Sequence, residues 1–279
     1  MSIVKRKKRN SEYFYIKHSY RRNGKVITKE KYLGKKIPPN IDEIKRKLNK
    51  ELYEKLGKIQ ENFQKEWKKY PESIKEKIKE DIAIAFTYNT NAIEGSTITL
   101  DDAREIIKDK IAPRKPLRDI KETEAHSKVF LDMLDKNEKI TNKLMLKWHQ
   151  DVFGQTKSDI SGKYRDYRVR VGDYVPPDWQ DVSSLMNKLV RFVNNSKLNS
   201  VELAARAHYR FESIHPFGDG NGRIGRLLLN FILWHNKYPM LIIEYKKRRS
   251  YYKALQKGED GFVSYFFRRY LAVNKNRIE

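Results

Sequence analysis

The segment from His215 to Arg226 combines a histidine, a carboxylate, alternating glycines and two arginines within a few turns of chain. Gly218, Gly220 and Gly222 can adopt positive φ angles and expose backbone N–H groups, and a helical pattern begins directly after them. Because the first turn of a helix carries a partial positive charge, this arrangement predicts an anion cradle.

The charged side chains beside this cradle suit phosphate chemistry. Arg223 and Arg226 are three residues apart, so both guanidinium groups can meet neighbouring phosphates from one helix face. Asp219 can hold a divalent cation among phosphate oxygens. His215, with an ordinary pKa of about 6.5, can accept a hydroxyl proton near neutral pH. The set predicts phosphoryl or nucleotidyl transfer, although a plain turn-rich surface loop would use the same Gly, Asp and Asn residues.

Helices are predicted to position this segment. Ser73 with Glu76 resembles a capping pair for a helix over residues 73–92, which ends at Glu94-Gly95. The absence of strand–helix alternation favours a mainly α-helical body. Apolar spacing predicts further helices at about 100–110, 116–136, 141–153, 180–195, 200–213, 223–236, 248–257 and 260–273.

Two segments predict β structure instead. Residues 164–177 alternate in side-chain character and end in two prolines, as a short exposed hairpin or flap would. Near the start of the chain, strands are predicted at 12–20 and 25–33 around an Asn23-Gly24 turn. A helix should follow from Asn40 to about Leu56.

The charge of the chain is concentrated near its start. The 279 residues carry a formal net charge of +24, and residues 1–50 alone hold 17 Lys and Arg against 4 Asp and Glu. This predicts a separate basic module, with nucleic acid as a candidate partner through residues 1–36. A solvated lysine-rich surface is the alternative.

The composition also excludes several classes of function. The chain has no cysteine, which excludes disulfides, thiolate catalysis and cysteine-ligated zinc. Its longest uncharged apolar stretch, Leu227–Asn236, is too short for a membrane span, and no secretory leader pattern is present. We therefore expect a cytoplasmic protein without a membrane partner. The other helical histidines, including His149 and His208, are expected to be ordinary satisfied imidazoles.

The segment His215–Arg226 matches in full the motif His-Pro-Phe-x-Asp/Glu-Gly-Asn-Gly-Arg-x-x-Arg, and the chain thereby resembles the Fic (Fido) family. Further features of that family recur in order: Gly162 to Arg165 before the flap, Val171-Gly172 and Pro176-Pro177 within it, and Arg248, Tyr251, Tyr252 and Leu255 after it. The resemblance covers roughly residues 73–272 and leaves residues 1–60 unexplained.

The resemblance implies a Fic-type helical bundle with a β-hairpin flap and an enzyme that moves AMP from ATP, with Mg²⁺ or Mn²⁺, to a Ser, Thr or Tyr hydroxyl of a protein. His215 would deprotonate the acceptor, Asp219 would bind the metal, and Phe217 would point into the core. The nucleotide would be held by Gly220, Asn221, Gly222, Arg223, Arg226, Tyr251, Tyr252 and Gly172. A packing role for Tyr251 and Tyr252 stays open.

The same family places an inhibitory pattern, Ser/Thr-x-x-x-Glu-Gly/Asn, before its core, and Thr90 to Gly95 matches it. The resemblance implies that Glu94 forms a two-pronged pair with Arg226 and so blocks the γ-phosphate. Removal of AMP is a second activity known among relatives. The alternative is that Glu94 only caps the end of its helix.

We therefore expect a basic β-hairpin module at 1–39, a helical linker at 40–72, a Fic domain at 73–272 with an inhibitory helix at about 73–95, and a tail at 273–279. A protein target would dock on the flap near residues 164–177. A homodimer stays open. The alternative function is a nucleic-acid-binding or toxin/antitoxin-type regulator that uses a different nucleotide or phosphate donor.

Overall fold

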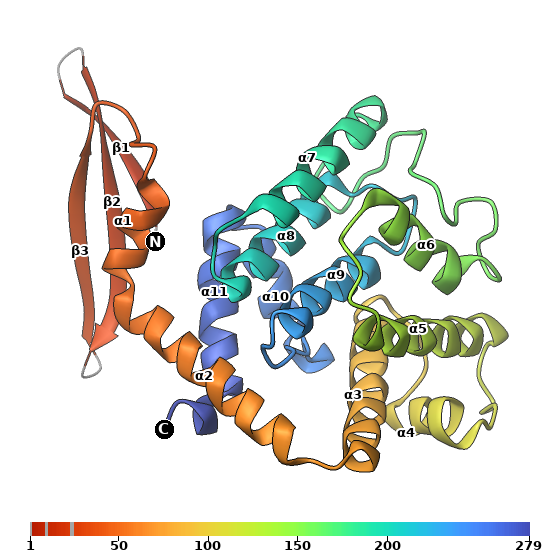
Figure 1. The fold of residues 1–279 in the computed structure, drawn as a ribbon. Coiled ribbons are helices and arrows are strands. Elements are labelled where there is room, and N and C mark those ends of the chain that lie inside the picture. Colours follow the sequence, from red (N-terminus) through yellow and green to blue (C-terminus); the bar gives the residue numbers. More distant parts are fainter. Residues whose placement is uncertain (1, 9–10, 23–24) are drawn as a thin grey trace.

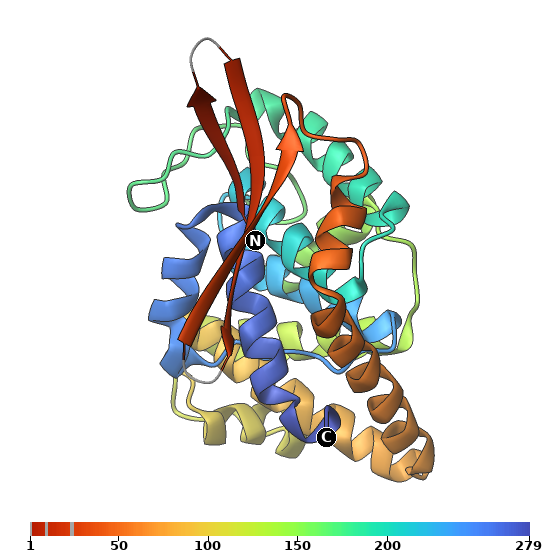
Figure 2. The ribbon, with the colours of Figure 1, turned by 90° about the vertical axis from the view of Figure 1, so that its left-hand side faces the viewer.

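A computed structural model describes residues 2–8, 11–22 and 25–279 of the chain. A helical body follows a small N-terminal sheet that stands at one side of it (Figures 1 and 2). The helices of the body are α2 (Lys50–Lys69), α3 (Glu72–Ile93), α4 (Leu100–Arg104), α5 (Leu117–Asp135), α6 (Asn142–Phe153), α7 (Val182–Asn195), α8 (Ser200–Ile214), α9 (Asn221–His235), α10 (Arg248–Leu255) and α11 (Gly258–Val273). The mainly helical fold predicted from the sequence is confirmed.

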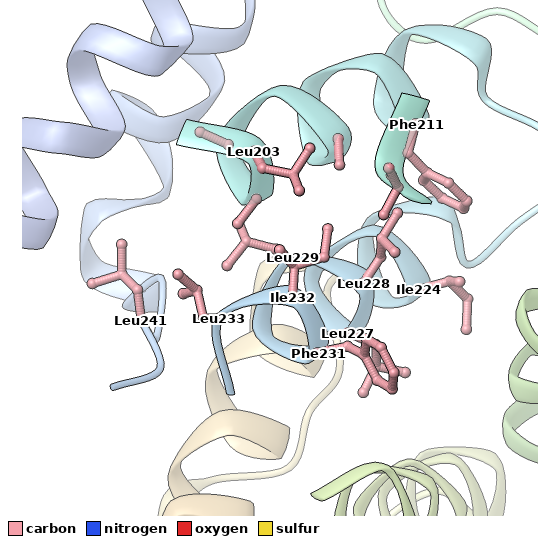
Figure 3. Close-up of a cluster of buried hydrophobic side chains, with 14 of the residues drawn as sticks. Leu203, Phe211, Ile224, Leu227, Leu228, Leu229, Phe231, Ile232, Leu233 and Leu241 are labelled. Carbon is pink, nitrogen blue, oxygen red and sulfur yellow. The ribbon is translucent and has the colours of Figure 1, made fainter. Parts of the chain in front are cut away.

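Helix α9 runs through the centre of the body. Every residue of its run Arg223–Leu233 is buried, which explains why the run is apolar apart from Arg223, Arg226 and Asn230. Helix α8 packs along α9, and Leu203 and Phe211 of α8 lie beside the leucines of α9 (Figure 3). This pair of helices fixes both ends of the loop at residues 215–220.

Three predicted helices differ in detail from the observed ones. The helix expected from Asn40 to Leu56 is divided at Asn49 into α1 (Ile41–Leu48) and the longer α2. Helix α3 begins after Pro71, whose fixed φ angle suits a helix start, so Ser73 is not the N-cap. The helix predicted at 100–110 is α4 followed by a π-helical turn at Glu105–Asp109.

The N-terminal module has three strands rather than two. Strands β1 (Ser2–Lys8), β2 (Ser11–Arg22) and β3 (Lys25–Gly34) form an antiparallel sheet in the order β1-β2-β3. The sequence prediction missed β1 because its run of basic residues masks the alternation of a strand. The predicted turn residues Asn23 and Gly24 lie outside the described residues.

The flap is less regular than predicted. Its strand pairing is limited to the bridge between Val171 and Tyr174, with N–H to carbonyl distances of 2.9 and 3.0 Å. Side chains hold the rest of the segment: the Tyr174 hydroxyl donates to the Ser213 carbonyl at 2.7 Å, and Arg165 donates to the Pro177 carbonyl at 2.6 Å. The segment 164–177 is therefore an anchored loop with one tight turn.

A search of the described residues finds no helix long and apolar enough to cross a membrane.

Candidate active site

His215 ends α8 in a left-handed conformation, with φ 51° and ψ 61°. Its N–H still donates to the Phe211 carbonyl, so the residue closes the last helical turn while the chain leaves in a new direction. Arg165 donates to the His215 carbonyl at 2.8 Å and to the Tyr167 carbonyl at 3.0 Å. These bonds tie the base of the flap to the predicted catalytic histidine.

The environment of His215 keeps its imidazole neutral. Burial lowers its pKa below the ordinary value of 6.5, while the Glu212 carbonyl and the carboxylates of Glu94 and Asp219 act in the opposite direction. The net pKa is lowered, so at neutral pH the ring is unprotonated and can accept a proton.

Two side chains shape the loop between α8 and α9. Asn221 accepts from the Phe217 N–H and donates to the Phe217 carbonyl, both at 2.9 Å. Phe217 is fully buried, as expected, and its ring stacks on His149 at 3.9 Å. His149 accepts from the Gly162 N–H, so its other ring nitrogen carries the proton and donates to the Asp219 carbonyl at 3.0 Å. His149 therefore positions the loop, a role that the sequence analysis missed.

The predicted anion cradle is the first turn of α9. Gly220 caps this helix with φ 78°, and the N–H groups of Asn221, Gly222 and Arg223 belong to the turn that has no intrahelical partners. A Cβ atom on Gly220 would collide with the Phe153 ring. A Cβ atom on Gly222 would collide with Glu94 Oε1. Gly220 thus lets the loop pack closely on Phe153, and Gly222 lets the carboxylate of Glu94 come close to the first turn of α9.

Glu94 brings its carboxylate to this turn from the end of α3. Its Oε1 accepts from Arg226 Nη2 at 2.6 Å, while Arg226 donates from Nε to Thr90 Oγ1 at 2.5 Å and from Nη2 to the Thr90 carbonyl at 3.1 Å. The pair with Arg226 that the resemblance implies is present in the structure. The pair is not the two-pronged one that the resemblance implies, however. One oxygen of Glu94 accepts from Arg226, and the other bonds of the guanidinium go to Thr90. The side chain of Arg226 is 2% exposed and that of Glu94 is 29% exposed, so the contact is partly buried.

Arg223 has a different carboxylate partner. Glu122 of α5 forms a close ion pair with Arg223 and accepts from Lys157 at 2.9 Å and from the Thr156 hydroxyl at 3.0 Å. Burial raises the pKa of Glu122, but Arg223 and Lys157 outweigh it and hold the pKa below the ordinary value. Arg223 Nε is buried and has no hydrogen-bond partner among the described residues.

Asp219 can serve as a metal ligand. Its side chain is 50% exposed, and its Oδ2 lies 2.8 Å from Lys157 Nζ. Burial raises its pKa, but Lys157 and Arg223 more than offset this, so the carboxylate is ionised at neutral pH. One carboxylate with room for phosphate oxygens and water fits Mg²⁺, which keeps several waters in protein sites. Within the described residues, no group of three or more His, Cys, Asp or Glu side chains forms a metal cage.

The other three residues predicted to contact the nucleotide, Tyr251, Tyr252 and Gly172, differ in how exposed they are. Tyr251 is 1% exposed, and its hydroxyl hydrogen-bonds to His208 Nε2 at 2.8 Å, which favours the packing role left open for it. Tyr252 is 41% exposed, and its hydroxyl donates to the Ile93 carbonyl at 3.3 Å beside Glu94. Gly172 lies in the flap turn with φ 56° and open surroundings. A role for these three residues in nucleotide binding stays a prediction.

Glu212 also lies beside this cluster. It is on α8, one turn before His215, and its Oε1 is buried without a hydrogen-bond partner among the described residues. Its pKa is raised to about 8, mainly by burial. The positive charge of Arg226 acts to lower this pKa, and the negative charge of Glu94 acts to raise it. The side chain is therefore a neutral acid at pH 7, and Arg226 has Glu94 as its ionised partner.

Residues 139–233 match the model of the Fic/DOC family. A protein of Nematostella vectensis named Protein adenylyltransferase Fic is 36% identical over 189 residues, which are 65% of this chain and 44% of that protein. The chain thus spans less than half the length of this relative. The structure is similar to Fic-1 of C. elegans, with a TM-score of 0.67 and 26% identity over 87% of this chain and 73% of that one. A Fic-domain-containing signaling protein of Bacteroides thetaiotaomicron shares the fold at a TM-score of 0.71 and 24% identity, over 80% of this chain and 96% of that one.

Proposed function

Because the chain contains a domain of the Fic/DOC family, we propose that it is a protein adenylyltransferase held in an inhibited state by Glu94. The transferred group is AMP, the donor is ATP, and the acceptor is a Ser, Thr or Tyr hydroxyl of a protein. The acceptor oxygen forms a bond to the α-phosphorus, the bond from that phosphorus to the bridging oxygen of pyrophosphate breaks, and the acceptor proton passes to His215.

The residues of the chain divide this work between them. His215, neutral at pH 7, takes the proton from the hydroxyl. The first turn of α9 binds phosphate oxygens through the N–H groups of Asn221, Gly222 and Arg223, without needing to rearrange during the reaction. Arg223 adds its positive charge beside this turn, where Glu122 holds the side chain. Asp219 would hold Mg²⁺ or Mn²⁺, which would neutralise charge on the phosphates.

The observation that carries this proposal is the position of the Glu94 carboxylate. It lies against Gly222 at the first turn of α9 and pairs with the buried Arg226. A carboxylate therefore already occupies an anion position that a nucleotide triphosphate would need. Inhibition follows from direct competition, because the Glu94 carboxylate fills the space beside Gly222 and takes the Arg226 hydrogen bond that the γ-phosphate would use. Removal of AMP is a second candidate activity of the same site.

The protein target is proposed to dock as an added strand on the flap. The backbone there makes only the Val171–Tyr174 bridge within the flap, so most of its N–H and carbonyl groups are available for pairing. Apolar side chains are exposed along the same segment, with Val175 at 67% and Tyr174 at 46%. Recognition through the backbone leaves the target sequence weakly specified.

Intact-mass measurement of the Glu94→Gly variant tests the proposal. The variant is incubated with Mg²⁺ and, separately, with ATP, GTP, CTP or UTP. The expected result is the gain of one or more AMP groups with ATP, and no gain in the Glu94→Gly/His215→Ala double variant. Calorimetric binding of ATP to the double variant shows whether its site still folds. An adduct of another group, or an adduct that persists without His215, would contradict the proposal.

A further inference from the structure

The N-terminal sheet has one face that differs in chemistry from the other. Side chains of neighbouring strands share a face where their residues are paired, and they alternate along each strand. The pairs Arg6–Tyr13 and Tyr15–Tyr32 therefore put three tyrosines and an arginine on one side of the sheet. Lys8 and Lys17 follow the same alternation. We call these six residues, Arg6, Lys8, Tyr13, Tyr15, Lys17 and Tyr32, the basic-aromatic face.

The opposite face of the sheet is the one that is covered. Ile16 is 0% exposed, and Ile3 and Phe14, which share its side of the sheet, are half-buried. On the basic-aromatic face, no described residue is fully buried: Tyr32 is 52% exposed, both lysines are exposed, and Tyr13 and Tyr15 are half-buried. The sheet stands at the side of the helical body and connects to it through α1 and α2 (Figures 1 and 2). Among the described residues of its basic-aromatic face, Arg6, Tyr32 and the two lysines are exposed and can contact a partner.

The tyrosines form a continuous aromatic surface. The ring centroids of Tyr15 and Tyr32 are 5.3 Å apart, and those of Tyr13 and Tyr32 are 6.2 Å apart. Arg6 lies over the Tyr15 ring at 5.0 Å and is held there by Glu30, which accepts from it at 2.8 and 3.0 Å. The exposed Tyr32 ring beside two half-buried tyrosines and exposed cations offers a stacking surface for a base and charges for its phosphates.

We propose that the basic-aromatic face binds single-stranded nucleic acid, in an interaction separate from AMP transfer. Charge complementarity supports the choice of a polyanion, since residues 1–50 carry 17 basic and 4 acidic residues. The tyrosines select bases over other polyanions, because every base has a face that can stack. A duplex offers fewer such faces, because its bases are already stacked on one another.

Fluorescence anisotropy with short labelled oligomers of equal length tests the proposal on the full chain. The probes are oligothymidylate, oligouridylate and a mixed-sequence duplex, each titrated across a range of salt concentrations. Both single strands are expected to bind more tightly than the duplex. Comparison of the two shows whether the 2′-hydroxyl and the base methyl group together change the affinity. Tighter binding of the duplex, or no binding of either single strand at low salt, would overturn the proposal.

Substitutions separate stacking from charge. Tyr32→Leu should weaken binding by about 5- to 150-fold, the range measured for loss of one stacked base, whereas Tyr32→Phe should keep most of the affinity. Lys8→Gln with Lys17→Gln should reduce the slope of log affinity against log salt by about 1.4, or about 0.7 for each phosphate that is no longer neutralised. The matched control is Lys65→Gln with Lys68→Gln, two exposed lysines of α2, which should leave the slope unchanged.

Two further measurements distinguish the alternatives. Circular dichroism melting should show that each variant keeps the fold of the parent chain. Polyglutamate or vesicles of anionic lipid that displace the oligomers at equal charge concentration would show that charge alone drives binding, which contradicts the proposal. An equal loss in the α2 control would do the same. AMP self-labelling of Glu94→Gly should be unaffected by Lys8→Gln/Lys17→Gln, so the two proposals can fail independently.

Discussion

Glu94 Oε1 lies 2.6 Å from Arg226 Nη2, although the two residues are 132 positions apart in the chain. Glu94 caps the last turn of α3, and Arg226 is in the second turn of the central helix α9. The contact therefore links the end of α3 to the helix whose first turn is the predicted anion cradle. A movement of the end of α3 that separates Glu94 from Arg226 would leave the Arg226 guanidinium available to a nucleotide.

Removal of the Glu94 carboxylate is expected to strengthen ATP binding. In Glu94→Gly, the guanidinium of Arg226 becomes available to a phosphate, and a charge-assisted hydrogen bond of this kind contributes about 1.5–3 kcal/mol. The affinity for ATP should rise by about 10- to 100-fold, measured by isothermal titration calorimetry. Glu94→Gln keeps the volume but not the charge and should give an intermediate value. Equal affinities in the wild type and Glu94→Gly would contradict competition at the cradle.

Loss of Arg226 is not expected to imitate loss of Glu94. Arg226→Ala also frees Glu94, but it removes the cation that would receive the γ-phosphate and opens a cavity beside Thr90. ATP affinity should stay at or below that of the wild type, and the melting temperature should fall. Arg226→Lys, which keeps a charge but lacks the fork, serves as the comparison. If Arg226→Ala bound ATP as tightly as Glu94→Gly, the arginine would have no part in productive binding.

The pH dependence of the reaction should report the lowered pKa of His215. A general base must be unprotonated, so the rate of self-labelling by Glu94→Gly should be level near pH 7–8 and fall as the imidazole becomes protonated. Since burial lowers this pKa, the rate should reach half of its maximum below pH 6.5. Single-turnover rates with saturating ATP give the profile. A midpoint above pH 6.5 would assign the base to another group or a different environment.

The raised pKa of Glu212 predicts an effect on stability. The folded protein holds the proton of this acid up to about pH 8, whereas the unfolded chain releases it near the ordinary value of 4.5. At a pH between these two pKa values, the chain therefore takes up a proton when it folds. The contribution of this group to the free energy of unfolding falls as the pH rises from about 4.5 to about 8. Urea unfolding at pH 5 and 8 should show a smaller decline in Glu212→Gln than in the wild type. The exposed Glu124→Gln is the control and should decline as the wild type does.

The elements around the site could be predicted from local patterns. Helical periodicity located α8 and α9 within two residues, because both helices bury wide apolar surfaces and a glycine loop separates them. The family resemblance carried by the 215–226 motif agrees with the Fic/DOC family model, which matches residues 139–233. The first strand of the N-terminal sheet was missed because neighbouring lysines and arginines hide which side chains face the same way.

The residues that hold the site in place could not be predicted in the same way. Glu122 meets Arg223 across 101 positions, His149 meets the Asp219 carbonyl across 70, and Arg165 meets the His215 carbonyl across 50. Each of them acts through a contact that exists only after α5, α6 and the flap pack against α9. A carboxylate within the apolar pattern of residues 116–136 was the one local sign of Glu122, because a buried charge needs a partner.

Labelling by ATP carrying a radioactive α-phosphate tests the central claim most directly. Wild type, Glu94→Gly and Glu94→Gly/His215→Ala are incubated side by side with Mg²⁺ and the labelled ATP, and a parallel set receives ATP labelled at the γ-phosphate. We expect weak labelling of the wild type, strong α-labelling of Glu94→Gly, none in the double variant, and no γ-labelling in any of them. Equal α-labelling of the wild type and Glu94→Gly, or transfer of the γ-phosphate, would contradict an adenylyltransferase restrained by Glu94.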